Sequence, residues 1–320
     1  MSKTYELYRS SKGGATGSWD KRASWTDYTA TLSVDRTSAD NVYRGGGFWT
    51  SSDGGQLFNS LAGPHADLHE FATDPTNPGL LYTVCDGGIY RSLDFGTHWA
   101  FFGEGLANVQ FYDHSVSVTD SNIAIGGTQD NGTIRYDGSS TVWSYIGGGD
   151  GGTVDIDPSN SSRLYAQIVD PGGDPGTQYI ASMSTSANGG ASFTNIGLGL
   201  PAAPTCQNGY FQVVPTFLSR ILASCQDLWT RTLVGGPLTE PWHRILCTSA
   251  NAFACPVGSP IVGGDVTRTA VDASVNLYYA GTSTGELWAG PNGADWKRVA
   301  TGIGGVRDTV STPTIRLISM

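Results

Sequence analysis

Short apolar runs alternate with tight polar turns along the chain. The clearest stretch, residues 69–105, reads HEFATDPTNPGLLYTVCDGGIYRSLDFGTHWAFFGEG. Two apolar runs lead to a turn at Asp86-Gly87-Gly88, and a third run and a short last run follow. Runs of this length between clusters of Gly, Asp, Asn and Pro are typical of β-strands. The stretch therefore predicts four consecutive short strands.

The turn after the third run carries a Ser-x-Asp-x-Gly-x-x-Trp string, from Ser92 to Trp99. Its aspartate can accept backbone N–H bonds across the turn, its glycine supplies a positive φ, and its aromatic ring packs beneath. Degenerate copies of this string occur at residues 10–19, 51–58, 186–193 and 290–296. The string is therefore predicted to shape a turn and not to carry chemistry.

The copies belong to a repeat of roughly 40 to 50 residues, which is the size of a four-stranded propeller blade. Innermost strands are predicted near Ala30–Val34, Glu70–Thr73, Ser115–Thr119, Thr153–Ile156, Phe211–Val214, Arg268–Val271 and Thr314–Ile318. The expectation is an all-β fold, a single seven-bladed β-propeller over residues 1–320. This propeller could be a module excised from a longer chain. The strings then lie on the turns between third and fourth strands, and the strand near Tyr5–Ser10 could complete the short last blade.

The Ser-x-Asp string is known as the Asp-box, or BNR repeat, and the chain resembles the Asp-box β-propeller superfamily over nearly its whole length. The superfamily includes sialidases, xyloglucanase-like glycoside hydrolases and sortilin-type receptors. The segments 86–88, 128–132 and 148–152 are similar to the group described only as BNR-repeat glycosyl hydrolase-like. The resemblance implies either a carbohydrate-active enzyme or a binding protein, because both use this scaffold.

Aspartates recur at one position of the repeat. Aligning the units on the aspartate that ends each inner strand places another acid seven residues upstream, at Asp67, Asp113, Asp150 and Asp265. The turns between second and third strands add Asp86, Asp130 and Asp227. In a propeller both loop sets lie on the face opposite the Asp-boxes, so we expect a ring of carboxylates there. Each acid could instead only cap its own turn.

Crowded carboxylates raise one another's pKa, which would let one act as a general acid and another as a base or nucleophile. The candidate catalytic residues are Asp67, Asp86, Asp130, Asp150, His65 and His69. The candidate substrate-binding residues are Gln129, Asn131, Tyr112, Asp113, Asp227 and Asp265. Amide groups suit sugar hydroxyls and tyrosine rings can stack on sugars, although Asn131-Gly132 is also ordinary turn chemistry.

Three potential ligands alternate in one loop, at His65, Asp67 and His69. Alternate residues of an extended chain point the same way, so they could converge on a divalent cation or orient substrate. Their spacing matches no strong zinc signature, and histidines that cap turns are the competing interpretation. No cofactor is expected to be required, and a structural or catalytic divalent cation is the alternative.

Charge and cysteine content limit which partners and which cellular compartment the sequence predicts. The formal net charge of -10 argues against nucleic acid, and no apolar stretch predicts membrane insertion. Cys206 with Cys225, and Cys247 with Cys255, are close enough in sequence to pair, leaving Cys85. We therefore expect a secreted or extracytoplasmic monomer whose signal is absent here. Five reduced thiols in a cytoplasmic protein are the alternative.

These patterns favour a glycoside hydrolase acting on a neutral poly- or oligosaccharide. An acidic rim would repel sialic acid, and few arginines fall in the predicted rim loops. The alternative is a non-catalytic propeller that binds a glycan or a protein. A catalytic site predicts two rim carboxylates about 5 to 10 Å apart, whereas a binding module predicts acids that satisfy their own turns.

Overall fold

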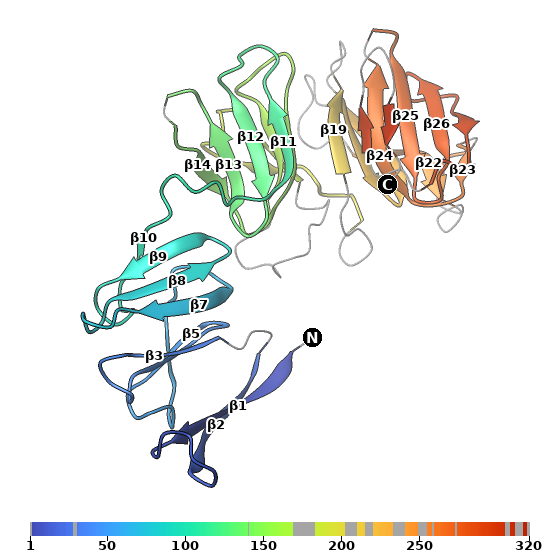
Figure 1. The fold of residues 1–320 in the computed structure, drawn as a ribbon. Helices are drawn as coiled ribbons and strands as arrows, with labels where there is room; N and C mark the ends of the chain where they lie inside the picture. Colours follow the sequence, from blue (N-terminus) through green and yellow to red (C-terminus); the bar gives the residue numbers. More distant parts are fainter. Residues whose placement is uncertain are drawn as a thin grey trace. The chain divides into compact units, whose positions relative to one another are not determined.

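The computed structural model contains only strands and turns in the residues that it describes (Figure 1). These are residues 2–27, 31–139, 141–168, 183–201, 210–214, 220–232, 241–248, 255–257, 259–272, 274–304, 308–310 and 316–318. Within them, no helix has the length and apolarity needed to cross a membrane. The chain divides into two compact units, Met1–Val109 (unit 1) and Gln110–Met320 (unit 2).

Unit 1 contains a hairpin and two four-stranded antiparallel sheets. The hairpin is β1 (Lys3–Ser10) and β2 (Trp19–Asp27). The first sheet is β3 (Leu32–Val34), β4 (Val42–Arg44), β5 (Phe48–Ser51) and β6 (Asn59–Leu61). The second is β7 (Leu68–Thr73), β8 (Leu81–Cys85), β9 (Gly88–Ser92) and β10 (Ala100–Phe101).

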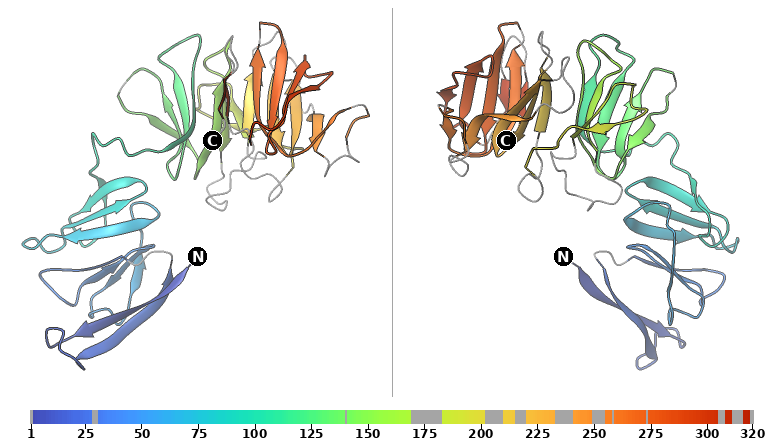
Figure 2. Two further views of the ribbon diagram at one scale, coloured as in Figure 1. Left: turned by 45° about the vertical axis from the view of Figure 1, so that its right-hand side comes forward. Right: turned by 180° about the vertical axis from the view of Figure 1, so that it is seen from behind.

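Unit 2 repeats the same meander, with the strands of each sheet in sequence order (Figure 2). Its first sheet is β11 (Phe111–Val116), β12 (Ala124–Thr128), β13 (Gly132–Tyr136) and β14 (Ser144–Gly147). Its second is β15 (Gly151–Ile156), β16 (Leu164–Ile168), β17 (Met183–Ser186) and β18 (Thr194–Asn195). The third is β19 (Tyr210–Val214), β20 (Arg220–Cys225), β21 (Asp227–Thr232), β22 (His243–Thr248) and a parallel fifth strand, β23 (Ile261–Val262). The rest are β24 (Val266–Asp272), β25 (Leu277–Thr282), β26 (Leu287–Pro291), β27 (Lys297–Ala300), and the pair β28 (Asp308–Val310), β29 (Arg316–Ile318).

The first strands of consecutive sheets are neighbours within each unit. In unit 1, β3 lies beside β7; in unit 2, β11, β15, β19, β24 and β28 follow one another. Six of the predicted inner strands overlap the first strand of a sheet, namely β3, β7, β11, β15, β19 and β24, although the strand predicted at Ser115–Thr119 shares only its first two residues with β11. The seventh overlaps β29, but β28 is the strand beside β24, and residues 314 and 315 lie outside the described part. The blade count, ring closure by β1 and the single domain stay predictions.

Apolar side chains from adjacent sheets form the core. β12 is buried along its whole length and β20 along all but its first residue, as expected for strands with both faces covered. The largest cluster joins β16 to the next sheet through Tyr165, Phe211 and Ile221. A second cluster packs Phe48 of one unit 1 sheet against Phe71 of the next. The blades are therefore held together by packing between their faces.

Four of the predicted strings fold into one turn geometry. In each, the serine hydroxyl accepts the backbone N–H of the residues two and four positions later. The distances are 3.3 and 2.9 Å at Ser51, 3.3 and 2.8 Å at Ser92, 3.3 and 2.9 Å at Ser186, and 3.2 and 3.0 Å at Ser10. The first three join the third strand of a sheet to the fourth. By the same geometry, β1 and β2 correspond to third and fourth strands.

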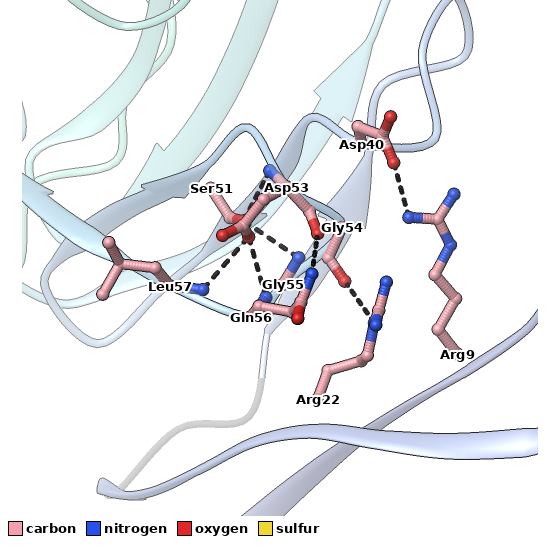
Figure 3. A network of polar contacts seen from close by, with 9 residues as sticks. All are labelled: Arg9, Arg22, Asp40, Ser51, Asp53, Gly54, Gly55, Gln56 and Leu57. Carbon is pink, nitrogen blue, oxygen red and sulfur yellow. Dashed lines mark hydrogen bonds and ion pairs between the residues drawn. The ribbon is translucent and has the colours of Figure 1, made fainter.

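Figure 3 shows the copy at Ser51, whose hydroxyl also donates to the Asp53 carboxylate. Oδ1 of Asp53 accepts the N–H of Gln56 at 2.8 Å and of Leu57 at 3.0 Å. Arg22 of β2 donates to the carbonyl of Gly54 in the same turn at 3.3 Å. The string therefore builds the turn from its own side chains, and the turn then helps to hold the hairpin.

Replacing Ser51 with alanine is expected to lower the free energy of unfolding by about 1 to 2 kcal/mol, because two N–H groups lose their acceptor. Chemical unfolding measures this change. The control is Ser60→Ala on β6 of the same sheet, where the side chain is exposed. Equal destabilisation by the two variants would contradict the role given to the Ser51 hydroxyl.

The cysteine predictions are confirmed where the structure describes them. Cys247 and Cys255 form a disulfide, and Cys85 is a buried free thiol. Cys225 is disulfide-bonded, while its predicted partner Cys206 lies outside the described residues. Stable disulfides are typical of proteins in oxidising, extracytoplasmic compartments.

Candidate functional site

Two loop sets meet at the same end of the sheets. Gly46, in the turn between β4 and β5, bridges Leu68 at the start of β7. In unit 2, Gly132 at the start of β13 bridges Asp150, just before β15. The turn between second and third strands therefore contacts the connection into the next sheet, as the repeat predicted. We call this end of the sheets the rim.

The rim of the β7–β10 sheet brings together four predicted residues of unit 1. Carboxylate oxygens of Asp67, before β7, and Asp86, in the β8–β9 turn, lie within 4.8 Å of one another. Nε2 of His69 hydrogen-bonds Oδ1 of Asp86. A Cβ added at Gly87 would lie 2.5 Å from Cδ2 of His65, so this imidazole packs on the Gly87 backbone. These residues form the first candidate site.

The local backbone explains how the two acids meet. Asp67 has a φ of 55°, a left-handed conformation that aspartate adopts more readily than most residues. Asp86 lies in a two-residue hairpin turn, because Cys85 pairs directly with Gly88. Both carboxylates are half-buried, and His69 is exposed. A half-buried acid pair with an imidazole beside one member suits proton transfer to and from a bound substrate.

The predicted metal ligands His65, Asp67 and His69 divide between different partners. His69 pairs with Asp86, and Nδ1 of His65 lies 3.2 Å from the carbonyl of Ala66. Two carboxylates suit a hard divalent cation better than zinc. The cation predicted at His65, Asp67 and His69 stays a prediction.

The rim of unit 2 gathers polar and aromatic groups around the β12–β13 turn. Oδ1 of Asp150 accepts the N–H of Asp130 at 2.6 Å, and the Asn131 amide donates to the carbonyl of Gln129 at 2.9 Å. Asp130 also has a positive φ, 57°. Asp150 is 5% exposed, and its carboxylate is held against the backbone of the β12–β13 turn. The competing interpretation had each acid cap its own turn, whereas Asp150, just before β15, binds a turn of the preceding sheet.

Two tyrosines lie beside this turn. Tyr112 is 45% exposed and Tyr145 is 65% exposed. A Cβ at Gly132 would lie 2.5 Å from Cε2 of Tyr145, which places that ring directly on the turn. Burial first, and then the charges of Asp150 and Asp130, raise the pKa of Tyr112. Exposed rings over amide and carboxylate groups can stack on sugars.

The remaining predicted acids have different surroundings. Asp227 is 1% exposed. Its carboxylate accepts the N–H of Thr248 at 2.8 Å and lies 3.3 Å from Nε of Arg244. It therefore stabilises the fold. Asp265 is exposed on the connection into β24.

Asp113 lies between inner strands of unit 2 rather than on the rim surface. Its Oδ2 accepts the N–H of Val154 at 3.1 Å. Burial raises the pKa of Asp113, while the bonds from Val154 and His114 oppose that rise. Asp113 therefore links β11 to β15.

Asp155 of β15 is a titrating residue that the sequence did not reveal. Its carboxylate accepts hydrogen bonds from the Ser115 hydroxyl of β11 at 3.1 Å, from the N–H of Ile156 at 2.8 Å and from the N–H of Val213 of β19 at 2.9 Å. Burial, with the charge of Asp113 as the smallest contribution, raises its pKa to about 6. The acids predicted from the repeat precede or end strands, whereas Asp155 lies inside one. Its partners come from the two neighbouring sheets, so the sequence of its own repeat does not indicate that it is buried.

Glu286 is a rim acid that the sequence pattern did not predict. It follows the β25–β26 turn. Its carboxylate accepts hydrogen bonds from the backbone N–H of Gly263 at 2.9 Å, the indole N–H of Trp288 at 3.0 Å and the guanidinium of Arg298 at 2.8 Å. The bond from Gly263 is the main cause of its lowered pKa. It directly follows the turn glycine Gly285, whereas Asp86 and Asp130 precede the glycine of their turns.

Comparison with known proteins found one similar sequence and several similar structures. No family model matches the chain. A xyloglucanase of Hypocrea jecorina is 30% identical over 136 residues, which cover 39% of this chain and 16% of that protein. The chain has an all-β propeller fold.

Solved structures similar to the propeller include two GH74 enzymes and a third protein. An ancestral GH74 enzyme has 13% identity and a TM-score of 0.44 over 88% of this chain and 41% of that chain. The GH74 xyloglucanase from Xanthomonas campestris has 16% identity and a TM-score of 0.41 over 92% and 47%. YCF48 from Cyanidioschyzon merolae has 11% identity and a TM-score of 0.38 over 84% of each chain. The propeller therefore spans less than half the length of the xyloglucanases it matches.

Proposed function

We propose that the propeller is carbohydrate-active and hydrolyses a neutral poly- or oligosaccharide with Asp67 and Asp86. The observation that carries the proposal is the approach of these two carboxylates to within 4.8 Å, from separate loops of one sheet. Carboxyl groups about 5 Å apart are typical of retaining glycosidases. The match to a xyloglucanase supports the same chemistry.

The surroundings of the two acids suggest different roles. Asp86 is hydrogen-bonded by His69, and an imidazole that donates to a carboxylate favours its ionised form. We assign Asp86 as the nucleophile. Asp67, from the other loop, would then donate a proton to the leaving oxygen and later take one from water.

Turnover on a panel of neutral oligosaccharides, xyloglucan fragments included, tests the proposal. Asp67→Asn and Asp86→Asn should each lower turnover at least tenfold. The matched control is Asp94→Asn in the Asp-box of the same sheet, where Asp94 also pairs with a histidine, His98. Asparagine is tolerated there, because Asn188 makes the equivalent turn elsewhere in this chain. Turnover that survives both rim substitutions would remove these acids from the mechanism.

A non-catalytic glycan-binding propeller is the second candidate. It is favoured by Asp150 and Asp227, whose carboxylates are occupied by the backbone N–H groups of Asp130 and Thr248, and by exposed Tyr112 and Tyr145. Saturable glycan binding without turnover would support it. Tyr145→Ala should then weaken binding, whereas Tyr8→Ala, an exposed tyrosine of β1, should not.

A further inference from the structure

A polar pocket lies at the Asp-box end of the β15–β18 sheet, the end opposite the rim. Its volume is about 250 Å³. Its lining includes the side chains of Arg163, Tyr165, Thr185, Asn188, Ser192 and Thr194. Five of them carry hydroxyl or amide groups, and Arg163 carries the charge. The lining therefore offers hydrogen-bond donors around one guanidinium.

The charge at this pocket differs from that at the Asp-box turns of Ser51 and Ser92. Asn188 occupies the position that Asp53 and Asp94 hold in unit 1. The turn geometry is unchanged, because the Ser186 hydroxyl bonds Oδ1 of Asn188 at 2.8 Å, as Ser51 does Asp53. The substitution therefore removes a negative charge at no cost to the turn.

The charge that remains at the surface is positive. Nη1 of Arg163 lies 3.5 Å from Oδ2 of Asp157, but the Asp157 side chain is 2% exposed and that of Arg163 is 36% exposed. The Asp157 carboxylate also accepts the N–H and hydroxyl of Ser159, at 2.8 and 2.6 Å. The negative partner is thus below the surface, and the guanidinium faces the pocket.

A second guanidinium lies beside the same turn. A Cβ at Gly189 would lie 3.6 Å from Nη2 of Arg135, which comes from the neighbouring β11–β14 sheet. Nη1 of Arg135 lies 3.8 Å from Oδ2 of Asp137, and its buried Nε has no hydrogen-bond partner among the described residues. Two arginines therefore flank the turn in which Asn188 replaces the acid.

We propose that this pocket binds a tetrahedral oxyanion, sulfate or phosphate, either free or as an ester on a sugar. A guanidinium binds such oxygens through parallel N–H donors, and the hydroxyls of Ser192 and Thr194 and the amide of Asn188 add neutral donors. An aspartate at position 188 would repel the anion. The site is independent of the rim and of the proposed hydrolysis.

Titration of the full chain with sodium sulfate at constant ionic strength, followed by calorimetry, tests the proposal. Saturable binding is expected for the wild type. Asn188→Asp should weaken it at least tenfold while the unfolding midpoint is unchanged, since Asp53 and Asp94 already make this turn. Arg163→Gln should weaken it similarly and serves as a second variant if the first does not fold. The control Asp94→Asn should bind as the wild type does.

The source of the anion is distinguished with a sulfated oligosaccharide and its unsulfated counterpart. Binding of the sulfated sugar more than tenfold tighter than sulfate indicates an ester, and equal affinities indicate the free ion. The proposal is overturned if sulfate, phosphate and the sulfated sugar all fail to saturate. It is also overturned if folded Asn188→Asp binds sulfate as tightly as the wild type.

Discussion

Replacing Gly127 with alanine is expected to destabilise unit 2 by about 3 kcal/mol, because the added methyl group meets backbone rather than a movable side chain. An ideal Cβ at Gly127 would lie 1.9 Å from the carbonyl oxygen of Gly152. Gly127 is on β12 and Gly152 on β15 of the next sheet. Relief would require the two sheets to separate along their contact.

Chemical unfolding of Gly127→Ala beside Gly263→Ala measures this effect. At Gly263 the nearest atoms to an added Cβ are the carboxylate atoms of Glu286, at 3.3 to 3.5 Å. That side chain end can shift, so a much smaller loss is expected there. Equal stability of Gly127→Ala and the wild type would show that the inter-sheet contact is looser than described.

The stability of unit 2 is expected to fall as the pH rises from about 4 to 6, because of Asp155. Its pKa in the folded protein is about 6, against about 3.9 in an unfolded chain. Between these values the folded state holds a proton that the unfolded state has lost, so each step up in pH favours unfolding. The full effect is about 2 to 3 kcal/mol.

Unfolding free energies of the wild type and Asp155→Asn, measured at pH 4 and pH 7, isolate this contribution. The unfolding free energy of Asp155→Asn relative to that of the wild type should be higher at pH 7 than at pH 4. The groups around Asp155 are Ser115, the N–H groups of Ile156 and Val213, and the charge of Asp113. Asp272→Asn is the control, since the hydrogen bond from Ser274 lowers the pKa of Asp272, and its contribution should have the opposite sign. A pH-independent difference for Asp155→Asn would contradict the account.

Much of the fold was predictable because its determinants are local. The Asp-box turn is built from Ser51 and Asp53 and their own backbone, so its string alone predicts a turn between third and fourth strands. The inner strands followed from the repeat. The parallel strand β23 was not predicted, because Ile261 pairs with Cys247 only after the chain folds back on itself.

The candidate site was predictable in position but not in role. The register of the repeat predicted that Asp67 and Asp86 would share the rim. The same register could not separate them from Asp150, because only the folded chain shows that Asp150 binds the N–H of Asp130. Asp155 was missed because its high pKa depends on burial between β11 and β19, which are distant in sequence.

The position of a bound neutral oligosaccharide in a crystal structure tests the central claim most directly. The account predicts a sugar residue whose glycosidic oxygen lies between the carboxylates of Asp67 and Asp86, with His69 still bonded to Asp86. An oligosaccharide held elsewhere on the propeller, with both carboxylates facing only solvent, would contradict it.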